Sequence, residues 1–175
     1  GKLNMPDGEI ATSPVETSVD GHIYFDFPGV LGGRLLEDIR LRWNKGKLVQ
    51  ATAATHQDFL QAVTRTDPGA SRIGEFAFGT NQAITRYSRD ILLDEKIGGT
   101  VHLALGRAYP DCGGVNSSAI HWDIVKDLRQ EGTVTLDVEI PANTTAIVHM
   151  PAQSHENVYE GEQRAVQAEG VTFLR

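Results

Sequence analysis

The sequence predicts an α+β fold, with a mixed, largely antiparallel sheet, short helices and a strand-rich C-terminal tail. Polar and apolar residues alternate at 38–43 and again at 132–140, as they do in half-buried strands. Helical spacing of apolar residues is confined to short stretches, of which 56–64 is the clearest. The chain has no internal repeat and no low-complexity segment.

Strands are expected where β-branched and aromatic residues cluster between turn residues. Before the tail, they fall at the following segments: 9–12, 22–27, 38–43, 48–53, 74–78, 101–105 and 119–125. The second segment ends at Pro28, and the glycines within 29–33 predict a loop after it. Asn44-Lys-Gly-Lys joins the third segment to the fourth and predicts a hairpin.

The helices expected from the pattern are short. Segment 56–64 has one apolar face and predicts an amphipathic helix. Asp67-Pro-Gly breaks that pattern, and a second short helix is expected to end at Arg72. The tail adds strand-like sequence at 145–150 and 171–174.

Composition limits the classes of function. The 175 residues suffice for one domain with a sizeable core. A net charge of −7 disfavours nucleic acid and anionic membrane surfaces as partners. Cys112 is the only cysteine, so no disulfide forms within the chain, which suits a reducing, cytoplasmic setting. No apolar run approaches the ~20 residues of a membrane span, and no signal peptide precedes the globular pattern.

Two histidines and an acid lie on strand-like segments within a short stretch of chain. Residues i and i+2 of a strand point to the same face, so His121 and Asp123 should converge while Trp122 points away. His102 lies in the middle of its own strand and can face the same place. One such histidine alone is more often a core residue hydrogen-bonded to an acid. Two of them beside a carboxylate favour a metal site.

Two further acids have unusual neighbours. Glu9 and Glu75 each follow a glycine, which lets a second backbone or a ligand approach closely. Glu75 is flanked by apolar residues, so its strand is expected to be partly buried. A buried carboxylate needs a partner, and a metal ion is a suitable one.

The charges favour two metal ions. Three carboxylates and one bridging hydroxide balance two divalent cations, as in co-catalytic metal pairs. One metal with spare carboxylates is the alternative. Tyr109 has three interpretations: a donor to a developing oxyanion, a residue that reaches the metal, or a packing residue beside Pro110.

At these residues the chain resembles the thermophilic metallo-aminopeptidases, the aminopeptidase T or leucyl aminopeptidase group. The resemblance runs over about residues 4–133 in order, and five motifs carry it: Asn4-Met-Pro-Asp-Gly-Glu, Gly29-Val-Leu-Gly-Gly-Arg, Gly74-Glu-Phe-Ala-Phe-Gly-Thr-Asn, Asp94-Glu-Lys-Ile-Gly-Gly-Thr-Val-His and Ser118-Ala-Ile-His-Trp-Asp.

The resemblance implies a cytoplasmic homodimer with a dinuclear zinc, cobalt or similar site that removes N-terminal residues from peptides. It implies the metal ligands Glu9, Glu75, His102, His121 and Asp123, with Tyr109 as the active-site tyrosine. Glu75 or Glu9 would also move protons, and the sequence does not choose between them. Members of the family have a further N-terminal domain, so 1–133 would be the catalytic part of a longer protein.

The tail, 134–175, resembles instead the C-terminal β-sandwich segment of bacterial α-L-rhamnosidases. Some forty residues cannot form a sandwich alone, so the tail is expected to add strands and not an independent domain. Two alternatives to an active peptidase therefore stay open. One is a non-catalytic metal-binding remnant or chimeric fragment, and the other is a carbohydrate-binding module.

Overall fold

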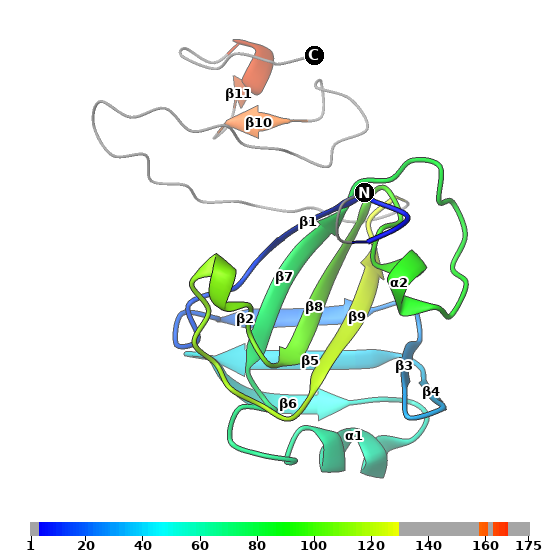
Figure 1. Ribbon diagram of the computed structural model, residues 1–175. Helices are drawn as coiled ribbons and strands as arrows, with labels where there is room; N and C mark the ends of the chain where they lie inside the picture. The colour runs from blue at the N-terminus through cyan, green and yellow to red at the C-terminus, as the bar shows by residue number, and fades with distance from the viewer. Residues whose placement is uncertain (1–3, 130–157, 161–162, 168–175) are drawn as a thin grey trace. The chain divides into compact units, whose positions relative to one another are not determined.

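The computed structural model describes residues 4–129, 158–160 and 163–167 (Figure 1). The chain divides into two compact units, Gly1–Gly132 and Thr133–Arg175. The strands described in the first unit are β1 (Glu9–Thr12), β2 (Gly21–Phe25), β3 (Gly29–Leu31), β4 (Arg34–Leu36), β5 (Ile39–Asn44), β6 (Lys47–Thr52), β7 (Ile73–Gly79), β8 (Thr100–Gly106) and β9 (His121–Asp127). The helices described there are α1 (Gln57–Val63) and α2 (Ile91–Asp94).

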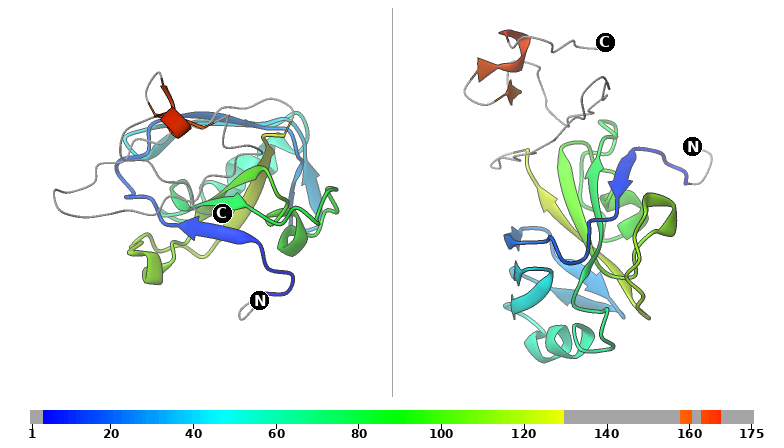
Figure 2. Two further views of the ribbon diagram at one scale, coloured as in Figure 1. Left: turned by 90° about the horizontal axis from the view of Figure 1, so that it is seen from above. Right: turned by 90° about the vertical axis from the view of Figure 1, so that its left-hand side faces the viewer.

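Two larger antiparallel sheets and the two-stranded sheet β3-β4 make up the described part of the first unit. One sheet has the strand order β1-β7-β8-β9, and the other has the order β2-β5-β6. Figure 1 shows the strands of the first sheet running across those of the second, and Figure 2 shows the same two layers from above and from the side. All strand pairs described are antiparallel. A single parallel bridge joins Asn81 to Ile97 outside the named strands of the described residues.

The hydrophobic core lies between the two sheets. In β5 the buried and exposed residues alternate strictly, which places Ile39, Leu41 and Trp43 on the inner face. The four-stranded sheet contributes Leu105 and Trp122 from the opposite side, both almost fully buried. Since one face of this sheet is covered by the core, its other face is available for polar side chains.

The remaining elements close the edges of this core. Helix α1 packs on β6 and buries Leu60 and Val63, as expected from the sequence pattern. The predicted strands of the first unit and the hairpin at 44–47 are confirmed, with ends shifted by one or two residues. Among the described residues, no helix has the length and apolar character that crossing a membrane requires.

Two predictions about local structure were wrong. Residues 29–36 form the hairpin β3–β4 and not a loop, because Gly32 and Gly33 both adopt positive φ and make a two-residue turn. The second short helix is absent from 65–72, which forms turns. There the carboxylate of Asp67 accepts hydrogen bonds from the Gly69 and Ala119 amides, and these bonds favour a loop over a helix.

In the second unit the structure describes a short hairpin, β10 (Tyr159–Glu160) paired with β11 (Gln163–Arg164), and a 3₁₀ turn at Ala165–Gln167. The strands expected at 132–140, 145–150 and 171–174 lie outside the described residues.

Candidate metal centre

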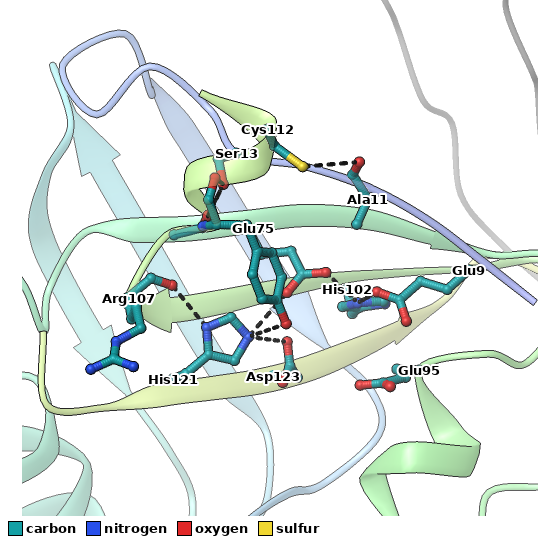
Figure 3. A network of polar contacts seen from close by, with 12 residues as sticks. Glu9, Ala11, Ser13, Glu75, Glu95, His102, Arg107, Cys112, His121 and Asp123 are labelled. Atoms are coloured by element: carbon teal, nitrogen blue, oxygen red, sulfur yellow. Dashed lines mark hydrogen bonds and ion pairs between the residues drawn. The ribbon is translucent and has the colours of Figure 1, made fainter. Parts of the chain in front are cut away.

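The outer face of the four-stranded sheet carries the candidate site residues (Figure 3). In β8, Leu103 and Leu105 turn to the core, so His102 and Ala104 face the other way. The register places Ala104 directly between Glu75 of β7 and Asp123 of β9. Because a methyl group fills so little space, these two carboxylates can approach each other above it.

The predicted arrangement of His121, Trp122 and Asp123 is confirmed. Trp122 is buried in the core, whereas His121 and Asp123 lie together on the opposite face. The Nε2 atom of His121 lies 3.6 Å from Oδ1 of Asp123. The alternation of the strand therefore places one imidazole and one carboxylate at a single point.

Among the described residues, two groups of potential metal ligands lie here. The first, here called the Glu9 group, consists of Glu9, Glu95 and His102. The second, here called the Asp123 group, consists of Glu75, His121 and Asp123. In each group, ligand atoms from all three residues lie within 4.8 Å of one another.

Glu75 connects the two groups. Its side chain is 1% exposed. Its Oε1 lies 3.5 Å from Nε2 of His102, and its Oε2 lies 3.0 Å from Nε2 of His121. One carboxylate thus directs one oxygen to each histidine, which is the arrangement that a ligand shared by two cations needs.

Glu95 and Lys96 are site residues that the sequence patterns did not reveal. Both are buried, and the Lys96 ammonium pairs with Glu95 and lies 3.3 Å from Oε2 of Glu9. A Glu-Lys pair beside two glycines has the composition of an exposed turn. The one available signal was its position inside a motif of the family resemblance, Asp94-Glu-Lys.

The ligand groups fit divalent cations. Within the described residues, buried polar atoms without a hydrogen-bond partner are concentrated here: both ring nitrogens of His102, Oε1 of Glu75 and Oδ1 of Asp123. Such atoms are costly to bury unless a partner satisfies them. His121 is oriented by its Nδ1–H, which donates to the Arg107 carbonyl oxygen at 2.8 Å and leaves Nε2 directed at the carboxylates. A carbonyl partner on one nitrogen is typical of histidines that bind metal through the other.

The carboxylates shift the titration of both histidines. Burial lowers the pKa of His102, but the Glu75 and Glu9 carboxylates outweigh it and raise the pKa to about 9. Asp123 and Glu75 raise the pKa of His121 to about 10. Burial raises the pKa of Glu9, yet His102 beside it prevails and lowers the pKa to about 2. Without metal, protons on the imidazoles therefore balance the carboxylates at neutral pH.

This electrostatic balance predicts that the metal-free chain loses stability at alkaline pH. Both histidines have a higher pKa in the folded chain than the ~6.5 of an unfolded chain. The stabilisation that the two protonated histidines give to the folded chain is therefore complete below about pH 6.5, and it disappears as the pH rises to 9–10. We expect the free energy of unfolding to fall by on the order of 3 kcal/mol between pH 6.5 and 9.5. Urea denaturation with chelator present measures the free energy of unfolding at each pH. A constant or rising value over this range would contradict the prediction.

Tyr109 lies at the open side of the site. Its side chain is 42% exposed, and its hydroxyl lies 3.3 Å from Nε2 of His121. The hydroxyl of Ser13 accepts a hydrogen bond from the Tyr109 amide and donates to the Gly74 carbonyl, which ties this loop to the site strands. Burial, followed by the Glu75 carboxylate, raises the pKa of Tyr109, so its hydroxyl stays protonated at neutral pH.

The glycines before the two acids have the role expected of them. A Cβ at Gly74 would overlap the backbone oxygen of Arg107, and a Cβ at Gly8 would overlap the Asn81 side chain. Gly8 also has a φ of +132°, which other residues rarely adopt. A neighbouring segment therefore lies close to the backbone at both glycines, and this contact fixes the backbone from which the Glu75 and Glu9 side chains extend.

Two adjacent carboxylate–imidazole groups on one β-sheet face make this face a candidate metal centre. The model of the thermophilic metalloprotease (M29) family matches residues 2–139. The chain belongs to this family.

Individual relatives agree with this assignment. The chain is 32% identical to aminopeptidase 2 of Geobacillus stearothermophilus, over 77% of this chain and 37% of the relative. It is 33% identical to aminopeptidase T of Thermus thermophilus, over 62% of this chain and 27% of the relative. The chain therefore spans about a third of the length of these relatives.

Solved structures show the same fold. Wild-type AmpT from Thermus thermophilus matches with a TM-score of 0.63 and 31% identity, over 69% of this chain and 33% of that one. The 2,5-dihydroxypyridine dioxygenase of Pseudomonas putida KT2440 matches with a TM-score of 0.51 over 66% of this chain and 37% of that one. Its identity of 18% shows a shared fold and nothing about activity.

Proposed function

We propose that this chain is the catalytic domain of a metallo-aminopeptidase, which hydrolyses the N-terminal residue from peptides with two divalent ions, zinc, cobalt or similar. The observation that carries the proposal is the pair of ligand groups joined by Glu75 on one sheet face. The names of the relatives as aminopeptidases support the choice of peptide substrate. A cytoplasmic location and a homodimer are further proposals, which rest on the family resemblance.

The Glu9 group and the Asp123 group would each hold one ion, with Glu75 as the shared ligand. When bound, such ions polarise a carbonyl group and generate a hydroxide nucleophile at neutral pH. The free amine of a peptide N-terminus would bind one of these ions or a carboxylate of this face, and the middle of a chain offers no such amine.

The chain's own residues provide the remaining functions. Tyr109, protonated and partly exposed, is placed to donate a hydrogen bond to the oxygen that becomes negative when a peptide carbonyl is attacked. Between the two acids considered for proton transfer, Glu9 is the more exposed, with 19% of its side chain accessible against 1% for Glu75. We therefore assign the central ligand role to Glu75.

The test compares hydrolysis of a leucyl chromogenic substrate with and without chelator. Activity should disappear on chelation and return with added zinc or cobalt. His102→Ala should lower the activity at least about 100-fold, because His102 is buried within the Glu9 group. His22→Ala is the matched control, since His22 lies exposed on the other sheet and should leave activity unchanged. Undiminished hydrolysis in chelator would refute the proposal.

A non-catalytic metal-binding domain is the second candidate. The chain spans only about a third of the length of its named relatives, so the activity of those whole proteins is a proposal for this chain. Elemental analysis of the same sample separates the two functions. Two metal ions per chain without any hydrolysis would favour the non-catalytic domain.

A further inference from the structure

The Glu9 group and the Asp123 group differ in one respect that the proposed function does not require. The Glu9 group contains a cation of its own, the ammonium of Lys96. This residue is 1% exposed, although lysine is rarely buried in full. Its Nζ lies 3.3 Å from Glu9 and also pairs with Glu95. Within the described residues, no lysine or arginine is paired with a member of the Asp123 group.

Lys96 gives only one of the two groups a counter-ion. In the Glu9 group its ammonium offsets one of the two carboxylates, Glu9 and Glu95. Asp123 pairs with no lysine or arginine in the described part of the chain, and Glu75 directs one oxygen to the histidine of each group, so its charge belongs to both. An ammonium also repels a divalent cation bound to the same carboxylates, and this repulsion is strong where little water screens it.

Lys96 also restricts how Glu9 can bind a cation. Oε2 of Glu9 faces the ammonium, while Oε1 lies 3.4 Å from Nε2 of His102. A cation beside His102 therefore finds one free oxygen on Glu9. Glu75, in contrast, accepts no bond from a lysine or arginine in the described part of the chain.

We propose that Lys96 makes the two metal positions unequal: the Asp123 group binds its divalent cation first and tightly, and the Glu9 group binds second and more weakly. Lys96 is an internal counter-ion that keeps Glu9 and Glu95 together while their position is empty. This inference rests on the proposed metal centre, but it concerns the order and strength of binding and not hydrolysis.

The experiment is a calorimetric titration of the complete, chelator-stripped chain with Co²⁺. The native chain should show two classes of site that differ at least about tenfold in affinity. Lys96→Met keeps the length of the side chain and removes its charge. It should tighten the weaker class about tenfold or more and leave the tighter class unchanged. Lys47→Met, which removes the same charge from the exposed first residue of strand β6, is the matched control and should change neither class.

Further variants assign the classes. His121→Ala should remove the tighter class and His102→Ala the weaker class, and the reverse pattern would overturn the proposal. Should Lys96→Met fail to fold, Glu95→Gln gives the complementary result, because it removes a negative charge and should weaken only the weaker class. A single class in the native chain, or a weaker class that Lys96→Met leaves unchanged or abolishes, would also overturn it.

Different experimental outcomes would contradict the proposed function and the proposed role of Lys96. A chain that binds Co²⁺ in two unequal classes but hydrolyses no peptide would contradict the aminopeptidase assignment and leave the role of Lys96 intact. A chain that hydrolyses peptides with two equal metal positions would do the opposite.

Discussion

Glu75→Gln is expected to remove both metal ions at once and to lower peptide hydrolysis by at least about a thousandfold. The two oxygens of Glu75 face the two histidines separately, at 3.5 Å from His102 and 3.0 Å from His121. The amide that replaces the carboxylate has one oxygen, no charge and an NH₂ group that would point at one of the two positions. Neither ligand group can therefore keep its native charge.

The measurement pairs metal content after dialysis with hydrolysis of a leucyl substrate. Glu37→Gln is the control, since Glu37 is exposed in the connection between β4 and β5 and should retain both ions. The ellipticity of the variant in the near ultraviolet should stay native, because glutamine fits the same space. Retention of both ions at native affinity would show that Glu75 is not the shared ligand.

Some of the predicted ligands follow from local geometry alone. His121 and Asp123 are two residues apart, so strand alternation alone brings them together, and the burial of Trp122 confirms the alternation. The strand of Glu75 was expected to be partly buried because apolar residues flank Glu75, and Glu75 itself is buried. Such inferences need no knowledge of which strands are neighbours.

The division into two groups could not be predicted in this way. It depends on the register of β7 and β9 against β8, which places Ala104 between Glu75 and Asp123. Register across strands distant in sequence follows from the packing of the whole sheet, and no short motif encodes it. The sequence therefore indicated the candidate ligands and left their grouping open.

The ion pairs of Lys96 show a similar limit. Lys96 reaches Glu9, a residue 87 positions earlier in the chain, because β1 and the segment after α2 meet at the same end of the sheet. Charged residues in a glycine-rich connection are normally exposed. Only the fold reveals that this pair is buried and thus that the Glu9 group has its own counter-ion.

The largest effect on stability is expected from Trp122→Ala. Trp122 is part of the core, and it lies in β9 between the site residues His121 and Asp123. The indole is 2% exposed, and it packs beside the backbone of Gly29 and the side chain of Ile39. Its removal should lower the free energy of unfolding by about 3–5 kcal/mol, through lost apolar burial and the cavity that remains. Urea denaturation of the chelator-treated chain measures this change.

Trp122→Phe is the matched variant that separates packing from polarity. Nε1 of Trp122 is buried and has no hydrogen-bond partner among the described residues, so the indole N–H already carries an energetic cost. Phenylalanine keeps most of the ring and removes that donor, and we expect it to cost at most about 1 kcal/mol. Both variants should bind metal when folded, since His121 and Asp123 point to the other face. Equal destabilisation by Ala and Phe would mean that a contact of the N–H, and not the packing of the ring, holds the two sheets together at this point.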